Sequence, residues 1–174
     1  MLGIPRDIVR LVPYTPEWVR LFDEERRQLQ DAVGEHVLDI QHIGSTAIPG
    51  MIAKPLLDIA IAVADFEAAR VCVEPIAALG YEYRGEGGIP RRHYFVKGEP
   101  RTHHVHMVEI GSQDWRQCLL FRDHLIRHPE AARQYAELKR LLAAEHRTDR
   151  AHYQAGKAAF VERILERASA CADG

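Results

Sequence analysis

A short polar turn in the first third of the chain carries residues that can bind phosphate. The run His42-Ile43-Gly44-Ser45-Thr46 comes after a stretch rich in apolar residues. Glycine lets the backbone approach a ligand closely, while backbone N–H groups and the two hydroxyls can donate to phosphate oxygens. A Gly-Ser pair alone is a common turn, so the prediction depends on the residues that come after it in the chain.

A carboxylate, Asp58, lies 13 positions after Ser45 and interrupts the apolar run of residues 56–63. An unpaired carboxylate there would cost several kcal/mol unless it meets a cation, a metal or hydrogen-bond donors. A salt bridge with Lys54 is one possibility, although four strand residues span roughly 13 Å. Mg²⁺ prefers one or two carboxylates plus phosphate oxygens. We therefore predict that Asp58 is catalytic and binds metal, with Lys54 beside the phosphate.

A second unusual segment, residues 102–110, combines histidines and an acid in a predicted strand. Alternation places His104 and His106 on one face and Glu109 on the other, so a regular strand can present only one set to Asp58. Glu109 would be a second metal carboxylate. The histidines would instead bind zinc or shuttle protons. All three are predicted catalytic residues, and a strand with hydrogen-bonded histidines is the structural alternative.

Basic residues elsewhere supply candidate phosphate ligands. Arg92 comes after a glycine-rich turn and could offer a guanidinium fork. Arg122 and Lys157 are further candidates among helical charges that otherwise alternate in sign, a pattern typical of an exposed face.

The elements that must position these residues are predicted from spacing. Thr15 and Pro16 begin a predicted amphipathic helix that Gly34 ends. Strands are expected at residues 37–43, 56–63, 81–84, 92–97 and 102–110. A helix over 65–79 should be kinked or divided at Pro75.

The last 60 or so residues are predicted to form helices over 113–127, 130–146 and 149–170. The order of helix, two strands, helix, several strands and then helices predicts an α+β (mixed α/β) fold with helices packed on one sheet. At 174 residues the chain suits one domain over residues 1–174.

Composition limits the classes of function. Formal net charge is −2, so no strong field attracts nucleic acid or an anionic membrane. No stretch approaches the eighteen or so apolar residues that span a bilayer, and the N-terminus lacks a signal pattern. The 3 cysteines form no metal or disulfide pattern. We expect a cytoplasmic protein.

The run from His42 to Gly50, continued by Lys54-Pro55-Leu56-Leu57-Asp58-Ile59, closely resembles the GrpB family, whose members lie in the nucleotidyltransferase superfamily. The likeness extends over nearly the whole chain. Other segments that share it are residues 12–18, 104–106, 121–125 and 153–157.

The resemblance implies a nucleotidyltransferase-like mixed sheet with a helical C-terminal third. In that fold a Gly-Ser turn, here Gly44 and Ser45, holds nucleotide phosphates, and carboxylates including Asp58 hold Mg²⁺. The superfamily usually places a second acid two residues after the first, where this chain has Ala60. Glu109, or His104 with His106, would have to complete the site.

The leading hypothesis is transfer of a nucleotidyl group from a nucleoside triphosphate to an unknown small acceptor. The cofactor would be Mg²⁺, with Zn²⁺ or Mn²⁺ as alternatives. A non-catalytic nucleotide- or metabolite-binding module is the second hypothesis, motivated by Ala60. The third is a metal-dependent hydrolase built around His42, His104 and His106.

Overall fold

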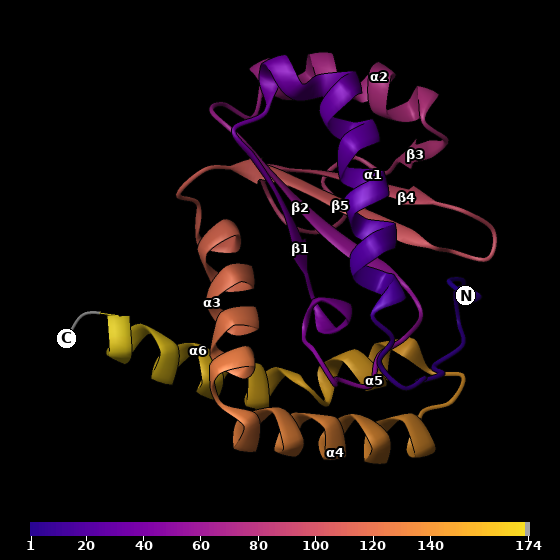
Figure 1. Cartoon of the computed structure of the whole chain (residues 1–174), viewed down its shortest axis with the longest axis vertical. Coiled ribbons are helices and arrows are strands. Elements are labelled where there is room, and N and C mark those ends of the chain that lie inside the picture. The colour runs from indigo at the N-terminus through magenta and orange to yellow at the C-terminus, as the bar shows by residue number, and fades with distance from the viewer. Residues whose placement is uncertain (173–174) are drawn as a thin grey trace.

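The computed structural model describes residues 1–172, with side chains described to residue 170. Its centre is a five-stranded sheet in the order β1-β2-β5-β4-β3 (Figure 1). The strands are β1 (Asp39–Ile43), β2 (Leu57–Val63), β3 (Tyr81–Tyr83), β4 (Arg92–Lys97) and β5 (His103–Glu109). β2 and β5 run parallel, and every other neighbouring pair is antiparallel. The predicted α+β class with a mixed sheet is confirmed.

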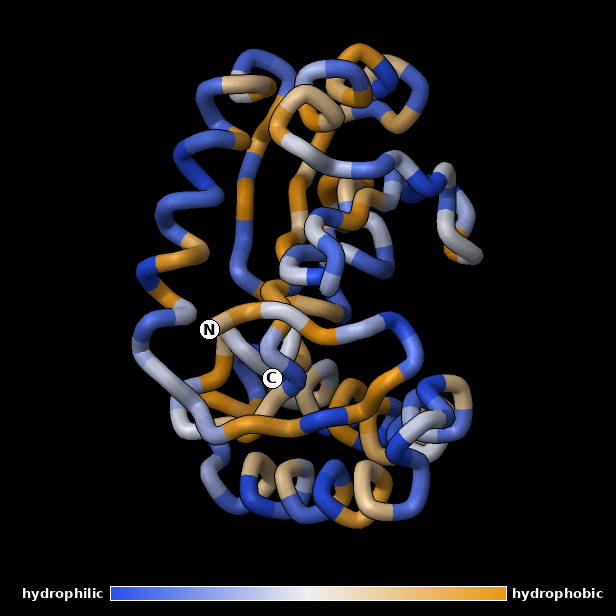
Figure 2. Tube along the Cα trace, turned by 90° about the vertical axis from the view of Figure 1, so that its right-hand side faces the viewer, coloured by the Kyte–Doolittle hydropathy of each residue, from blue (hydrophilic) through white to orange (hydrophobic). Residues whose placement is uncertain are grey.

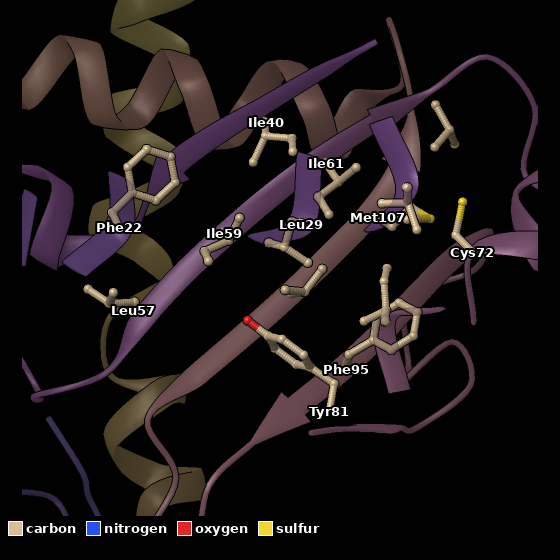
Figure 3. Packing of buried hydrophobic residues seen from close by; sticks show 14 of the residues in the cluster. Phe22, Leu29, Ile40, Leu57, Ile59, Ile61, Cys72, Tyr81, Phe95 and Met107 are labelled. Carbon is tan, nitrogen blue, oxygen red and sulfur yellow. The ribbon is translucent and has the colours of Figure 1, made fainter. Parts of the chain in front are cut away.

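One face of the sheet is covered by α1 (Glu17–Val33) and by a short 3₁₀ turn (Ala68–Cys72) followed by α2 (Val73–Ala78). The main apolar core lies between these helices and the strands (Figure 3). Alternate residues of β2, Leu57, Ile59 and Ile61, point into this core and are fully buried. Figure 2 shows the same division, with mostly apolar central strands and a mostly polar α1.

The opposite face of the sheet is covered by α3 (Gln113–Arg127), whose Trp115 packs with Ile43 and Ala60. Below the sheet in Figure 1 lie α4 (Pro129–Glu145), α5 (Arg150–Ala155) and α6 (Ala158–Ala172). α4 and α6 pack around the loop between β1 and β2 through apolar contacts that include Ile48 and Met51. The helical third therefore reaches the turn that was predicted to bind phosphate.

Two predicted helices are divided. Residues 65–79 form the 3₁₀ turn and then α2, in agreement with the expected effect of Pro75. The single helix predicted over 149–170 is wrong, because the chain breaks at Gly156 between α5 and α6. A Cβ at Gly156 would lie 2.4 Å from a methyl group of Leu142, so glycine lets the break pack closely on α4. This break brings Lys157 toward the sheet.

A buried charge network fastens α1 to the sheet. Glu25, only 5% exposed, accepts hydrogen bonds from the Tyr81 hydroxyl at 2.8 Å and from Lys97 Nζ at 2.7 Å. Burial and the neighbouring Glu25 carboxylate strongly raise the pKa of Tyr81, which therefore stays a donor. One carboxylate thus joins α1 to both β3 and β4.

Glu25→Ala should lower the free energy of unfolding by about 3 kcal/mol, because it leaves a buried donor and a cation without their acceptor. Urea unfolding measures the change. Glu24→Ala is the matched control, since Glu24 is exposed and, among the described side chains, pairs only with Arg20. It should cost about 0.5 kcal/mol or less. Equal effects of the two substitutions would contradict this role for Glu25.

Within the described residues, none of the helices has the length and apolar character needed to cross a membrane. Cys72 and Cys118 are free thiols, and the side chain of Cys171 lies outside the described residues.

Candidate functional site

The predicted phosphate turn and the predicted catalytic carboxylate are in contact. Ile43, the last residue of β1, pairs with Asp58 on β2, and the chain then turns through Gly44 into a 3₁₀ segment, Ser45–Ala47. Gly44 has φ +70°, and a Cβ there would lie 2.9 Å from Asp58 Oδ2. Glycine is therefore required both by the backbone conformation and by the close approach of the carboxylate.

Both histidines of β5 face Asp58. The parallel pairing sets Asp58 beside His104 and Ala60 beside His106, so these side chains share one face of the sheet. His104 Nδ1 lies 3.2 Å and His106 Nε2 lies 3.5 Å from the same carboxylate oxygen, Oδ1. Burial opposes ionisation, yet the hydrogen bonds from the two imidazoles hold the pKa of Asp58 well below its usual range. Asp58 is thus an anion held by two N–H donors.

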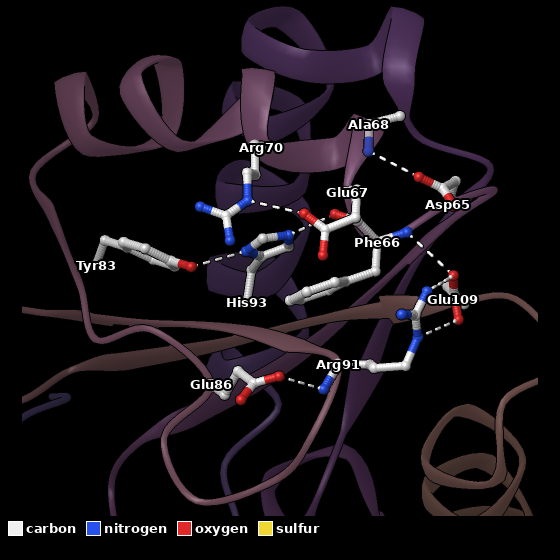
Figure 4. Close-up of polar contacts among 10 residues, drawn as sticks. All are labelled: Asp65, Phe66, Glu67, Ala68, Arg70, Tyr83, Glu86, Arg91, His93 and Glu109. Carbon is white, nitrogen blue, oxygen red and sulfur yellow. Dashed lines mark hydrogen bonds and ion pairs between the residues drawn. The ribbon is translucent and has the colours of Figure 1, made fainter.

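Glu109 does not join Asp58 and the histidines, because its side chain contacts Arg91 and Phe66 (Figure 4). It ends β5 with its side chain on the opposite face, where Oε1 and Oε2 accept from the Arg91 guanidinium at 2.6 and 3.2 Å. The Phe66 backbone N–H also donates to Oε1 at 3.1 Å. These hydrogen bonds lower the pKa of Glu109. The structure does not bring Glu109 to Asp58, because seven-residue pairing of β2 with β5 keeps strict alternation up to the end of the strand.

Arg92 points toward the site but is engaged by the protein. Its Nη1 donates to His106 Nδ1 at 3.1 Å, while Nε and Nη2 donate to the carbonyl oxygens of Glu86 and Gly87 at 3.1 and 2.8 Å. The guanidinium also stacks on the Tyr94 ring at 4.7 Å and is only 7% exposed. The Arg92 guanidinium, which was predicted to bind phosphate, therefore donates its hydrogen bonds to acceptors within the protein.

His42 and Arg122 hold other parts of the protein together and do not line the small cavity beside the Gly44–Ser45 turn that is described below. His42 points to the α1 face, stacks on Phe22 with ring centroids 4.8 Å apart, and meets Thr46 Oγ1 at 2.9 Å. Burial lowers the pKa of His42 to about 4, so the ring is neutral. Arg122 donates to the His42 carbonyl at 2.8 Å and to Gln41 Oε1 at 2.9 Å, which ties α3 to β1.

Three lysines converge on a small cavity beside the turn, which we call the lysine pocket. Lys54 comes from the loop before β2, Lys139 from α4 and Lys157 from the break between α5 and α6. The cavity is about 140 Å³ and is also lined by Gly44, Ser45, Thr46, Asp58, Tyr135, Tyr153 and Gln154. Lysines distant in sequence thus meet at the predicted phosphate turn.

Asp58 lines the lysine pocket, but the three ammonium groups form no ion pair with it. Lys139, 1% exposed, donates to Ser45 Oγ at 2.9 Å and to the Ile52 carbonyl. Lys157 lies over the Tyr153 ring at 4.6 Å. Among residues 1–170, none of the three lysines forms an ion pair with a carboxylate within 4.0 Å. Three cations, one of them buried, thus share a cavity with a single carboxylate, so the pocket is electrostatically suited to an anion.

The lysines also lower one another's pKa. Burial, reinforced by neighbouring cations, lowers the pKa of Lys139 and of Lys157 to about 7. The pKa of Lys54 is lowered too, by burial and by Arg150 and Arg101, although Asp58 opposes the shift. An anion in the pocket would reverse these shifts, because it favours the protonated amines.

Sequence reasoning missed Lys139 because α4 carries many exposed charges. A signal was nevertheless present. The buried positions of α4 are Ala131, Tyr135, Lys139 and Leu142, which lie at helical spacing along one face. A lysine inside such a stripe must find acceptors or an anion, and Lys139 finds Ser45.

A divalent cation fits Asp58 alone better than it fits the whole cluster. Oδ1 accepts from both imidazoles, whereas Oδ2 faces the turn and receives no hydrogen bond within the described chain. One carboxylate with phosphate oxygens and water is a usual Mg²⁺ environment. The nearest ligand atoms of Asp58, His104 and His106 lie within 4.8 Å of one another, but His106 does not fit as a ligand while Arg92 donates to its other nitrogen.

A second carboxylate on β2 is absent at the position where the family resemblance led us to look for one. Ala60 is 1% exposed and packs with Ile43, Val108 and Trp115. Apolar packing between the sheet and α3 therefore occupies that position.

Comparison with known proteins gives one consistent family. The family model described as GrpB protein matches residues 8–167. The UPF0157 protein YqkA of Bacillus subtilis (strain 168) is 43% identical over 165 residues, which cover 94% of this chain and 48% of that protein, so the chain spans about half its length. The glutamate-rich protein GrpB of Alkalihalophilus pseudofirmus is 35% identical, with 95% of this chain and 98% of that protein covered.

A solved structure agrees with the sequence matches. The crystal structure of the conserved protein GrpB from Enterococcus faecalis superposes with a TM-score of 0.86 at 36% identity, and the match covers 91% of this chain and 96% of that one. Over most of its length the chain thus shares its fold with a protein of that name. With a family model matched over nearly its whole length, the chain belongs to the GrpB family.

Proposed function

We propose that this protein binds the polyphosphate of a nucleoside triphosphate and transfers the nucleotidyl group to a small acceptor. The observation that carries the proposal is the convergence of three lysines, none of them ion-paired among residues 1–170, on the Gly44–Ser45 turn and Asp58. Ammonium groups and a glycine turn suit phosphate oxygens, and the adjacent carboxylate suits the cation that accompanies them.

The dimensions of the lysine pocket support binding of phosphates rather than of a whole nucleotide. Pockets that enclose drug-sized ligands are about 300–1,000 Å³, whereas this cavity is about 140 Å³. We infer that the β- and γ-phosphates enter the cavity, and that the nucleoside extends toward solvent. The α-phosphate would then lie near Asp58, at the edge of the cavity.

In the proposed reaction the oxygen or nitrogen of an acceptor hydroxyl or amine forms a bond to the α-phosphorus and loses its proton to solvent. The bond from that phosphorus to the bridging oxygen breaks, and pyrophosphate leaves. The lysine pocket would stabilise the negative charge that develops on the pyrophosphate. His104 and His106 hold Asp58 ionised and aimed at the turn, so they are positioning residues here. A divalent cation on Asp58 Oδ2, Mg²⁺ or Mn²⁺, would offset charge on the transferred phosphate.

Calorimetry with ATP and GTP, each with and without Mg²⁺, tests the binding step. We expect one site per chain that requires the triphosphate, with the nucleoside alone binding much more weakly because it cannot fill the lysine pocket. Failure of both nucleotides to bind under every condition would contradict the proposal.

Affinity for the triphosphate should fall as pH rises above 7. In the protein without ligand, Lys139 and Lys157 have pKa values lowered to about 7, and a bound polyanion raises them, so binding takes up protons in this range. The triphosphate itself is almost fully ionised above about pH 7.5, so the loss reports the lysines. Between pH 7.5 and 9 the dissociation constant should rise by up to about tenfold per pH unit for each proton taken up. Calorimetry in buffers of different ionisation enthalpy measures this uptake, and a flat profile would exclude it.

A binding module without catalysis is the second candidate, and the apolar packing of Ala60 favours it because it leaves one carboxylate on β2. The two candidates differ in pyrophosphate release. A triphosphate labelled in its γ-phosphate, tested over a panel of small hydroxyl and amine acceptors, should release pyrophosphate only if the protein is a transferase. Sustained release that depends on Asp58 would exclude the binding module.

A further inference from the structure

The hydrogen bond from Arg92 to His106 determines which nitrogen of that imidazole carries the proton. A guanidinium has only N–H donors, so His106 Nδ1, 3.1 Å from Arg92 Nη1, must present its lone pair. In the neutral ring the proton is then on Nε2, which faces Asp58 Oδ1 at 3.5 Å. A flipped ring would place carbon atoms at both contacts and lose both hydrogen bonds. The neighbours of His106 therefore assign the Nε2–H tautomer.

This tautomer is incompatible with metal binding by the nitrogen that faces Asp58. A metal ligand must offer a lone pair, and a metal-bound imidazole usually donates its other N–H to a carboxylate or a carbonyl. In this protein the other nitrogen meets a donor instead. For Nε2 to coordinate, the proton would have to move to Nδ1 and oppose the Arg92 N–H directly. Asp58, His104 and His106 are close enough to hold an ion. However, the partner of His106 Nδ1 is Arg92, a hydrogen-bond donor, where a metal-bound imidazole needs an acceptor.

The surroundings keep Arg92 in place. Two of its nitrogens donate to backbone carbonyls of Glu86 and Gly87, and its plane stacks on Tyr94. A Cβ at Gly87 would lie 2.8 Å from Arg92 Nη2 and 2.7 Å from the Tyr94 ring, so the glycine turn lies directly against both groups. The guanidinium cannot turn away from His106 without losing these contacts and disturbing the turn.

We propose that Arg92 determines the metal selectivity of this site: by fixing His106 as a donor to Asp58, it prevents Asp58, His104 and His106 from binding Zn²⁺ or a similar transition-metal ion. The cation site that remains is the oxygen Oδ2 of Asp58, which suits Mg²⁺ with phosphate oxygens. The inference extends the proposed function, but it concerns the protein without nucleotide. The outcome of its tests therefore does not depend on whether the protein catalyses nucleotidyl transfer.

Nitrogen-15 NMR of the full chain tests the tautomer directly. Long-range proton–nitrogen correlations of His106, identified by its loss in His106→Gln, should show a protonated Nε2 and an unprotonated Nδ1 in the wild-type protein at neutral pH. A protonated Nδ1 would overturn the proposal. This measurement needs no substitution at Arg92, so it does not depend on the folding of the Arg92 variants.

Metal titration of Arg92 variants tests the consequence. Arg92→Met removes the donor and should raise the affinity for Co²⁺ or Zn²⁺ by at least about tenfold, the usual size of effects from groups that contact metal-bound histidines. Cobalt d–d absorption reports coordination by the imidazole, and the gain should vanish in Arg92→Met combined with His106→Gln. Arg92→Lys keeps a cationic donor and should remain close to the wild type.

Two further results would overturn the proposal. One is tight, stoichiometric Zn²⁺ binding by the wild-type protein that is lost in His106→Gln, which would instead support a metal-dependent hydrolase. The other is an unchanged metal affinity in a folded Arg92→Met variant, with folding checked by near-ultraviolet circular dichroism.

Discussion

Replacing both Lys139 and Lys157 by methionine should weaken triphosphate binding by about 100-fold or more. Each charge-assisted hydrogen bond to a phosphate is worth about 1.5–3 kcal/mol, so two together correspond to roughly two to four orders of magnitude in the dissociation constant. Methionine keeps most of the length of each side chain and its contact with Tyr135 or Tyr153. Calorimetry with ATP and Mg²⁺ measures the loss.

The same substitutions should lower the free energy of unfolding of the ligand-free protein by less than they lower the free energy of triphosphate binding. Lys157 forms no ion pair or side-chain hydrogen bond in the described chain, and burial, reinforced by Lys54, lowers its pKa to about 7. Lys157→Met alone should therefore preserve the free energy of unfolding or raise it, because it removes a half-buried cation without an ion-pair partner. Lys139→Met should lower the free energy of unfolding, because Ser45 Oγ and the Ile52 carbonyl lose a donor.

Arg140→Met is the matched control for the lysine pair. Arg140 is the next residue on α4, but it is exposed and pairs with Glu137 at 3.2 Å. Its loss should change triphosphate affinity by less than about threefold, since exposed charges are largely screened. If Arg140→Met weakens binding as much as the double variant does, the phosphates bind over the surface of α4 and not in the lysine pocket.

Local sequence patterns were enough to predict most elements and the contact at the centre of the site. Apolar spacing identified α1 and the strands, and the turn at Ser45 and the carboxylate of Asp58 were predicted to lie together because each stands at the end of a strand. The glycine at position 44 then meets Asp58, because β1 and β2 pair up to their ends. These inferences need only one or two neighbouring elements.

Which side chains join Asp58 could not be predicted from either strand alone. Alternation along β5 separates the histidines from Glu109, but only the register between β2 and β5 decides which set faces Asp58. That register is a long-range property, since about 45 residues separate the paired positions. Lys139 and Lys157 were harder still, because their positions depend on how α4 and the break at Gly156 pack beneath the sheet.

Asp58→Asn should abolish nucleotidyl transfer, with a fall of about 10³-fold or more, while triphosphate binding through the lysine pocket changes far less. The amide keeps an oxygen that can accept from His104 and His106, so the geometry of the cluster can persist. It loses the negative charge on Oδ2 beside Gly44, and with it the means to hold a divalent cation against the phosphate. Pyrophosphate release and calorimetry on the same variant separate the two effects.

The pH dependence of stability gives this variant a second readout. The folded-state pKa of Asp58 is held below its unfolded value, so its ionised form stabilises the fold above about pH 4, and this contribution is lost as pH falls through the lowered pKa. Asp58→Asn should therefore cost about 1–3 kcal/mol at neutral pH, the worth of hydrogen bonds to a charged group, and progressively less in acid.

Glu109→Gln is the matched control among the carboxylates. Glu109 bonds to Arg91 and to the Phe66 backbone on the opposite face of β5, so its replacement should leave transfer within about threefold of the wild type while weakening that surface contact. If Glu109→Gln in a folded protein removes transfer as fully as Asp58→Asn does, Glu109 must reach the phosphates in the working enzyme. In that case the end of β5 would have to rearrange during the reaction, and the histidines could not be the groups that hold Asp58 throughout.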